Sequence, residues 1–378
     1  MAEVLLFGAG KIGEMIATML VDTGDYAVTV ADRDQARLDR IAGVDGVTPV
    51  SIDAAQESAL ERLLDGKYAV LSATPYTLTP IIAGAAKAAG AHYLDLTEDV
   101  NSTRLVKALA EGARTAFIPQ CGLAPGFISI VAYDLAKRFD RLHTVQMRVG
   151  ALPKYPTNAL KYNLTWSTDG LINEYCNLCE AVVDGETREV PPLEEVEHFS
   201  LDGVAYEAFN TSGGLGTLCE TLDGHVQNLN YRTVRYPGHR DIIKTLIKDL
   251  RLGEQRDLLK QILEHAVPMT LQDVVLIFVT VSGDRDGRFM QESYAQKVYS
   301  RDIAGTRWSA IQITTASGIC AMVDLLRDGK LPQKGFVKQE DTALDDFLAN
   351  RFGANYARSQ TMIAGARATA ADVTQQVA

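Results

Sequence analysis

Three glycines near the start of the chain have the spacing that binds phosphate groups. Gly8, Gly10 and Gly13 follow the apolar run 4–7 and open the helix-like segment 12–21. In this arrangement the first glycine allows a tight turn, the second lets a ligand approach the backbone, and the third lets helix and strand pack closely. Free N–H groups at the start of the helix then face the phosphates. The spacing therefore predicts a dinucleotide site.

An acidic residue stands where the second strand of such a unit ends. A carboxylate at Asp32 accepts hydrogen bonds from both ribose hydroxyls and repels a 2′-phosphate. The expected cofactor is therefore NAD⁺, and the guanidinium of Arg33 is the one neighbouring feature that favours NADP⁺. The residues expected to contact the cofactor are Gly8, Ala9, Gly10, Lys11, Ile12, Gly13, Asp32, Arg33, Ala73, Thr74, Pro75 and Thr97.

Polar residues also follow three later strands of the same unit, at 72–76, 95–99 and 120–122. Ligands of open parallel sheets bind at the carboxyl ends of the strands. We therefore expect these segments to meet in one crevice, with 72–76 running beneath the nicotinamide. Cys121 lies at this edge and is interpreted as a packing residue near the cofactor.

The elements that must position these residues alternate regularly over the first 122 positions. Buried strands are predicted at 4–7, 27–31, 47–50, 68–73, 93–96 and 116–119. Helices are predicted at 12–21, 35–41, 54–64, 79–89 and 102–113, with Asn101 or Ser102 capping the last. Strands alternating with helices form a parallel sheet covered on both faces. The predicted fold class is α/β, with a doubly wound Rossmann sheet.

The pattern changes after residue 123. A helical segment reaches about residue 137, strand-like runs follow at 144–149 and 274–281, and turn-rich segments separate them. We expect 1–123 to form the NAD-binding domain and 124–309 to form a second, α+β domain that binds substrate and forms the oligomer. A helix is predicted from 309 to 326, and residues 310–378 are expected to pack back on the first domain.

The composition excludes several classes of protein. The 378 residues carry a net charge of −11, which argues against a nucleic-acid or membrane partner. No apolar run is long enough to span a bilayer, the first residues lack a secretory signal, and five scattered cysteines suggest reduced thiols, so a cytoplasmic protein is expected. Cys176 and Cys179 lack partners at metal-ligand spacing and are interpreted as semi-buried thiols on a helix, so no metal is expected.

Several long blocks resemble the lysine 6-dehydrogenases, within the saccharopine dehydrogenase-like superfamily. The likeness runs essentially end to end and is carried by 95–99, 119–127, 190–195, 206–214 and 231–239. It implies an oxidoreductase of lysine catabolism that uses NAD⁺ to oxidise the ε-amine of L-lysine. Ammonia is released, and the product, 2-aminoadipate 6-semialdehyde, cyclises to a piperideine carboxylate. The resemblance also suggests a homodimer.

The glutamate-forming saccharopine dehydrogenases are the alternative within the same superfamily. These enzymes have a segment that resembles residues 158–167 of this chain, in which Tyr162, Trp166 and Ser167 are retained. They carry Asp where this chain has Ala124, and an Asn-Arg-Asp triplet for which no arginine stands between 206 and 216. Losing an arginine that grips a carboxylate fits a substrate without the glutamate moiety, which favours free lysine. A third reading, from a different class, is a non-catalytic NAD⁺ sensor.

Oxidation of an amine requires a group that removes a proton from the ammonium before hydride leaves the carbon. Glu98 is the expected base, Asp95 its support, and His239 and His225 are further candidates; both carboxylates could instead cap the following helix. Tyr76, Cys121 and Trp166 are expected pocket walls. Arg235 is expected to grip the lysine carboxylate, with N–H donors from the turn at Thr211 and Ser212, although a structural ion pair is the alternative for Arg235.

Overall fold

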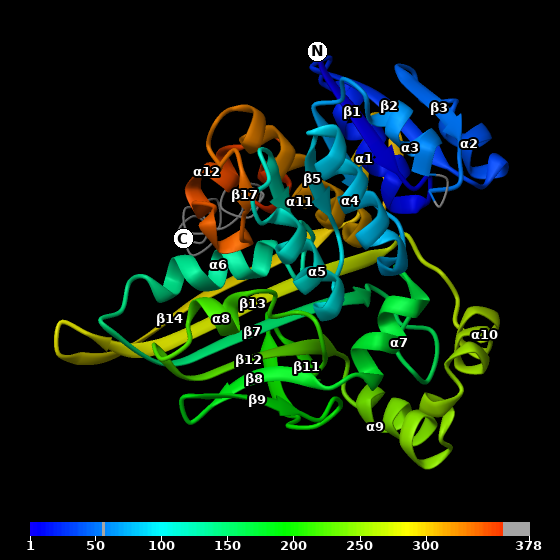
Figure 1. Cartoon of the computed structure of the whole chain (residues 1–378). Coiled ribbons are helices and arrows are strands. Elements are labelled where there is room, and N and C mark those ends of the chain that lie inside the picture. The colour runs from blue at the N-terminus through cyan, green and yellow to red at the C-terminus, as the bar shows by residue number, and fades with distance from the viewer. Residues whose placement is uncertain (55–56, 358–378) are drawn as a thin grey trace, which may run out of the picture.

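The computed structural model describes residues 1–54 and 57–357, and its first layer is a seven-stranded parallel sheet. The strand order is β17-β6-β5-β4-β1-β2-β3, which confirms the predicted Rossmann topology (Figure 1). The strands are β1 Ala2–Phe7, β2 Tyr26–Asp32, β3 Val47–Ser51, β4 Ala69–Ser72, β5 His92–Asp95, β6 Ala116–Ile118 and β17 Gly335–Phe336.

Alternate side chains of these strands enter two separate cores, one on each face of the sheet. In β1, Val4 and Leu6 belong to one core, whereas Leu5 and Phe7 belong to the other. This alternation follows from the period-two geometry of a strand, and helices must cover both faces because both are apolar. The covering helices are α1 Lys11–Asp22, α2 Gln35–Ile41, α3 Glu57–Leu64, α4 Thr79–Ala89 and α5 Val100–Ala110.

The second layer is a mixed eight-stranded sheet that lies below the first in Figure 1. Its main path runs β10-β11-β12-β7-β13-β14, with β8 and β9 attached to β12, and only the β7–β12 pair is parallel. The strands are β7 Arg141–Pro153, β8 Cys179–Val183, β9 Glu186–Val190, β10 Glu197–Leu201, β11 Val204–Asn210, β12 Val226–Arg235, β13 Asp273–Arg285 and β14 Arg288–Tyr299.

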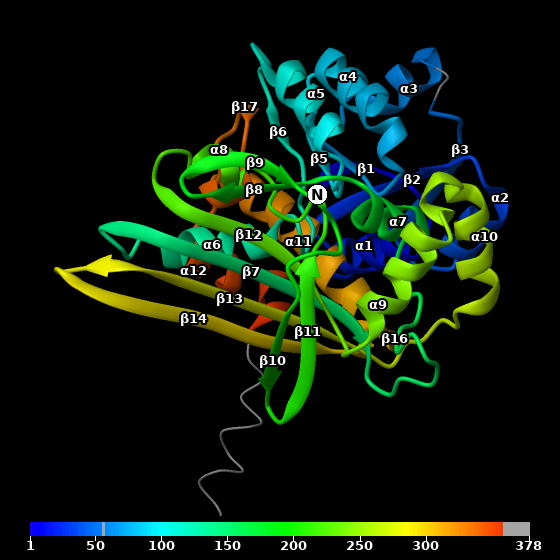
Figure 2. The same ribbon diagram turned by 90° about the horizontal axis from the view of Figure 1, so that it is seen from below.

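Helices of this second part line one end of the mixed sheet and the space between the layers. Figure 1 shows α7, α9 and α10 gathered at one end of the mixed sheet, below the first sheet, and Figure 2 shows them at the same end from below. The helices are α6 Phe127–Ala136, α7 Thr168–Cys176, α8 Leu218–Thr221, α9 His239–Lys244 and α10 Arg256–Ala266. The α+β character predicted for this part of the chain is confirmed.

The chain then returns to the first sheet. After the short hairpin β15 Arg301–Ile303 and β16 Thr306–Trp308, helix α11 (Ala310–Arg327) packs against α1, and β17 pairs with β6. The Asp273 carboxylate receives the N–H groups of Ala310 and Ile311 at the start of α11. A last helix, α12, spans Leu344–Ala349. Residues 358–378, part of the segment expected to pack back, lie outside the described residues.

Two local expectations were wrong. Helix α5 begins at Val100 and is capped by the Asp99 side chain, which receives the Ser102 N–H at 2.7 Å, rather than by Asn101 or Ser102. Helix α7 ends at Cys176, so Cys179 stands in β8 and the two thiols do not share a helix. Within the described chain, no helix is both long and apolar enough to cross a membrane.

Candidate active site

The turn from Gly8 to Gly13, here called the cradle, has the shape that a dinucleotide requires. Gly8 has φ +102°, and a methyl group there would lie 2.7 Å from the Ala73 carbonyl oxygen. A methyl group at Gly13 would overlap the Gly8 carbonyl, whereas one at Gly10 would meet nothing within 4 Å. The backbone is thus tightly packed behind the cradle and open at Gly10, at the start of α1. These residues fit a pyrophosphate.

Side chains around the cradle hold its shape. The backbone N–H of Ala9 donates to Asp32 Oδ2 at 2.8 Å, which ties the end of β2 to the turn. Arg37 approaches the same carboxylate at 3.9 Å, and Arg33 is exposed on the adjoining loop. Lys11 Nζ reaches the sulfur of Met269 at 2.9 Å, and Ile12 packs against the larger core. Both signs of charge therefore surround the expected ribose position.

The segment after β4 lies beside the cradle, as the sheet order requires. Ala73 N–H donates to the Phe7 carbonyl, and the Thr74 and Ser72 hydroxyls are 2.9 Å apart. Pro75 begins the short 3₁₀ helix that contains the partly buried Tyr76. Thr97 is buried, and its hydroxyl accepts the Asp99 N–H.

Asp95 joins the ends of two strands. Its carboxylate accepts the N–H of Thr97 at 3.0 Å, the N–H of Gln120 at 2.9 Å and the hydroxyl of Tyr93 at 2.9 Å. Burial raises the pKa of Asp95 to about 6, and these hydrogen bonds oppose the rise. Every contact of this carboxylate is internal, so its position suits support of the neighbouring loop.

Glu98 extends from the loop after β5 into the second part of the molecule. A methyl group on Gly170 of α7 would lie 3.1 Å from Glu98 Oε1 and 2.3 Å from the Trp166 ring. On the other side, a methyl group on Gly213 would lie 2.7 Å from the Glu98 carbonyl oxygen. Burial, with smaller contributions from Asp99 and Asp95, raises the pKa of Glu98 to about 7.

A second buried carboxylate, Glu174, was not among the residues predicted from the sequence. It lies on α7, four residues after Gly170, and only 8% of the residue is exposed. Burial raises its pKa to about 8; the positive charge of Arg235 opposes this rise and the negative charge of Glu98 adds to it. The sequence did contain a signal that could have identified Glu174: positions 170 and 174 are four residues apart and therefore share one face of α7.

The turn at 211–216 is hydrogen-bonded to α7. Ser212 donates its backbone N–H to the Glu174 carbonyl and its hydroxyl to the Asn173 carbonyl, each at 3.1 Å. The Thr211 hydroxyl is 2.7 Å from that of Thr233 in β12. The Ser212 N–H is therefore already used inside the protein, which leaves it no proton to donate to a ligand.

Arg235, at the end of β12, is held by a chain of hydrogen bonds. Its Nε donates to the Tyr175 hydroxyl at 3.0 Å, which in turn lies 3.0 Å from Nε2 of His239. His239 Nδ1 is 2.8 Å from the Leu160 carbonyl. Because that carbonyl can only accept, Nδ1 carries the proton and Nε2 accepts from Tyr175. Burial and then Arg235 lower the pKa of His239 to about 3, so the ring is neutral.

We call the buried group formed by Glu98, Trp166, Gly170, Glu174 and Arg235 the amine pocket, after the role expected for Glu98 and Arg235 from the sequence. Tyr162 lies against it, with the Arg235 guanidinium 4.9 Å from the centre of its ring. Its hydroxyl is buried and, within the described residues, makes no well-formed hydrogen bond. The same is true of one buried side-chain atom in each of Asn163, Thr165 and Asn210. Buried polar atoms are normally paired, so this cluster is suited to a polar ligand.

Two predicted residues lie away from this group. Cys121 is fully buried and directs its thiol to the Ile118 carbonyl, while Gln339 donates to its sulfur at 3.3 Å, which is the geometry of a packing residue. His225 is exposed in the turn before β12. Among the described residues, no group of three or more His, Cys, Asp or Glu side chains is placed to hold a metal ion.

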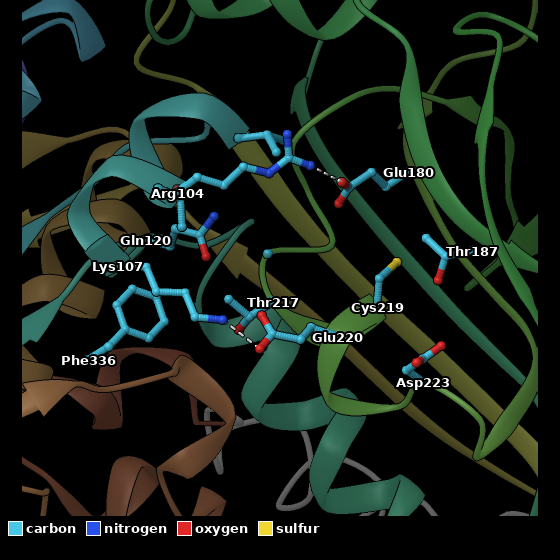
Figure 3. Close-up of a pocket in the computed structure, with 13 residues that line it drawn as sticks. Arg104, Lys107, Gln120, Glu180, Thr187, Thr217, Cys219, Glu220, Asp223 and Phe336 are labelled. Carbon is cyan, nitrogen blue, oxygen red and sulfur yellow. Dashed lines mark hydrogen bonds and ion pairs between the residues drawn. The ribbon is translucent and has the colours of Figure 1, made fainter. Parts of the chain in front are cut away.

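A separate groove of about 400 Å³, lined by none of the five residues of the amine pocket, lies between α5 and the β8–β9 hairpin. Two ion pairs flank it, Arg104 with Glu180 at 3.1 Å and Lys107 with Glu220 at 2.6 Å (Figure 3). Gln120, which follows β6, also lines it. The groove thus brings cations from the first layer to acidic residues of the second.

Family models match almost the whole described chain. Residues 4–116 match the NADP binding domain of saccharopine dehydrogenase, and residues 122–352 match the saccharopine dehydrogenase C-terminal domain. The first layer is therefore a pyridine-nucleotide binding domain.

Individual relatives agree with these models. A glutamate-forming, NADP⁺-linked saccharopine dehydrogenase of Saccharomyces cerevisiae is 26% identical over 65% of this chain and 57% of its own length. One from Pyricularia oryzae is 23% identical over 82% of this chain and 71% of its own, and the mitochondrial alpha-aminoadipic semialdehyde synthase of Bos taurus is 21% identical over 78% and 33%. The chain thus spans little more than half of the yeast relative and a third of the bovine one.

The solved structure of the apo yeast saccharopine dehydrogenase (L-Glu forming) has the same fold. It superposes with a TM-score of 0.75 at 18% identity, covering 97% of this chain and 98% of that one. From its sequence and its two-layer architecture, the chain belongs to the saccharopine dehydrogenase family.

Proposed function

We propose that this protein is an amino-acid dehydrogenase that oxidises the ε-amine of L-lysine with NAD⁺. The observation that carries the proposal is the position of Glu98. Its carboxylate follows β5 at the cofactor edge of the first sheet and enters the amine pocket. A pKa of about 7 lets this group take and return a proton near neutral pH.

The reaction assigns one task to each part of the site. The bound nucleotide supplies the hydride acceptor for the substrate carbon. Glu98 removes a proton from the ε-ammonium, and Asp95 fixes the loop that carries Glu98. Loss of hydride from Cε to the nucleotide leaves an iminium ion. Water adds to this carbon to give a carbinolamine, which expels ammonia and leaves the aldehyde. Arg235 binds the substrate carboxylate, and the Tyr175–His239 chain orients Arg235 rather than removing protons.

The preference for NAD⁺ rests on Asp32. Its carboxylate already anchors Ala9 of the cradle and would repel a 2′-phosphate. Arg33 and Arg37 are the residues that favour NADP⁺, and the family model is named for that nucleotide. Assays with NAD⁺ and with NADP⁺ in parallel measure which nucleotide the protein prefers.

Saccharopine is the second candidate substrate, and one observation favours it. The groove between α5 and the β8–β9 hairpin carries Arg104 and Lys107, whose charges suit the additional carboxylates of a glutamate moiety. Both cations face acidic partners in this structure. The names of the relatives also favour saccharopine.

The test is absorbance of the reduced nucleotide with purified protein and four combinations, L-lysine or saccharopine with NAD⁺ or NADP⁺. Reduction of NAD⁺ by lysine, with ammonia released in equal amount, is expected. Reduction only with saccharopine assigns the second candidate. Nucleotide binding without any reduction identifies a sensor and ends the proposal. The mass of the protein in solution tests the homodimer that the family resemblance suggests.

A further inference from the structure

The two acids of the amine pocket meet at one face of α7: Glu174 belongs to this helix, and Glu98 packs against it from the loop after β5. The Glu98 carboxylate lies against Gly170, and Glu174 is one helical turn further along the same face. Side chains four residues apart on a helix are neighbours, so the pocket contains two successive carboxylates rather than one. The Ser212 contacts to Asn173 and Glu174 fix this part of the helix.

Neither Glu174 nor Arg235 is neutralised by an ion pair within the described chain. The charge of Arg235 acts on Glu174 without an ion-pair contact between them, and the hydrogen bonds that Arg235 donates go to the Tyr175 hydroxyl and the Val234 carbonyl. Only 2% of Arg235 is exposed. Burial raises the pKa of Glu174 to about 8, so this acid is mostly neutral near pH 7 until a cation lies beside it, whereas Arg235 stays charged. A ligand that carries an ammonium and a carboxylate would supply both missing partners.

Within the part of the chain that the structure describes, polar atoms around the two groups also lack well-formed hydrogen bonds. The Tyr162 hydroxyl is buried and makes no well-formed hydrogen bond with the described residues; the side chains of Thr165 and Trp166 interact with it, and the Arg235 guanidinium lies over its ring. This is a second observation, independent of charge, that points to a polar ligand.

We propose that Glu174 binds the α-ammonium of the substrate and so determines its class. The proposal rests on the proposed function. Two carboxylates and one guanidinium match the two ammonium groups and one carboxylate of a basic amino acid such as lysine. Glu98 receives the terminal amine because it follows β5 at the cofactor edge, whereas Glu174 lies a turn away beside Arg235. The favoured substrates therefore carry an α-ammonium as well as a terminal amine.

The test compares lysine with 6-aminohexanoate, which has the same chain but no α-ammonium, in Glu174→Gln and wild-type holoenzyme. For lysine, kcat/KM of the variant should fall about 30-fold, mainly through KM, the loss expected for a charge-assisted hydrogen bond. Inhibition by 6-aminohexanoate should change less than about twofold, because its α-carbon has no ammonium to lose a partner. Asp169→Asn is the matched control, since Asp169 is on α7 but pairs with Lys260 outside the pocket.

Each other outcome overturns the proposal. An unchanged KM for lysine removes Glu174 from substrate binding, and equal losses for both molecules assign it to packing or catalysis instead. Should Glu174→Gln fail to fold, judged by circular dichroism, Glu174→Asp replaces it, and the lysine-specific loss must still appear. If the wild type does not oxidise lysine at all, the proposed function fails. Calorimetric binding of lysine and 6-aminohexanoate to the nucleotide complex still tests Glu174.

Discussion

The cradle follows β1 and Glu98 of the amine pocket follows β5 in the same sheet, but the two regions are built in opposite ways. The cradle is six consecutive residues, and its binding groups are backbone N–H groups at the start of α1. The amine pocket takes side chains from the loop after β5, from α7 and from the end of β12, which are separated by up to 137 positions. A site made of local backbone can be recognised from a short motif, whereas one made of distant side chains depends on the complete fold.

The largest effect should come from the amine pocket, with Glu98→Gln. The amide cannot accept the proton, so kcat should fall by about 10²–10⁴-fold, the usual contribution of a general base. Nucleotide affinity, measured by fluorescence titration, should stay the same because the cradle is untouched. Comparable loss of nucleotide binding would show that the two regions are not separate.

The pH dependence of kcat/KM tests the same role of Glu98. Only the ionised carboxylate accepts a proton, so wild-type kcat/KM should rise with pH through about 7, where burial has placed the pKa of Glu98. Glu98→Gln should lose this step. Glu111→Gln, an exposed carboxylate at the end of α5, is the control and should retain it.

In the cradle, Gly10→Ala and Gly13→Ala should fail for different reasons. An alanine at Gly10 meets nothing in the free protein, so the thermal unfolding midpoint should hold while nucleotide affinity falls at least about tenfold, because the methyl group occupies ligand space. An alanine at Gly13 collides with the Gly8 carbonyl, so the midpoint itself should fall. Equal midpoints for the two variants would contradict this division.

A smaller change is expected for Asp32→Asn. Asparagine keeps an oxygen that can accept the Ala9 N–H, but the charge that repels a 2′-phosphate is gone. The ratio of kcat/KM for NAD⁺ to that for NADP⁺ should fall about tenfold, equivalent to roughly 1.4 kcal/mol. An unchanged ratio would assign nucleotide choice to Arg33 and Arg37 instead.

The smallest effect is expected for Tyr175→Phe, which removes the hydroxyl between Arg235 and His239. Arg235 keeps its bond to the Val234 carbonyl but loses orientation, so KM for lysine should rise about fivefold, the value of one ordinary hydrogen bond. The kcat should stay within about twofold, as befits a positioning residue. Tyr236→Phe, which breaks a hydrogen bond to Pro153, is the control.

The sequence was a good guide to the first layer and a partial guide to the site. Six of its strands and the cradle follow from local patterns, but β17 is only two residues long and carries no pattern of its own. Glu174 was not predicted because its burial on α7 depends on distant segments, among them the Glu98 loop and the 211–216 turn, packing against that helix. The role of His239 depends on Tyr175, sixty-four positions away, occupying its Nε2.

The return of the chain to its first sheet limits how the two layers can move. The backbone crosses from one layer to the other between β6 and α6, and back again between β14 and α11. Both layers also contribute to one continuous hydrophobic core, to which Leu6 of β1 and Ile277 of β13 belong, and this core further restricts their relative motion. Because the chain crosses between the layers twice, one proteolytic cut in either connection would leave them joined by the other.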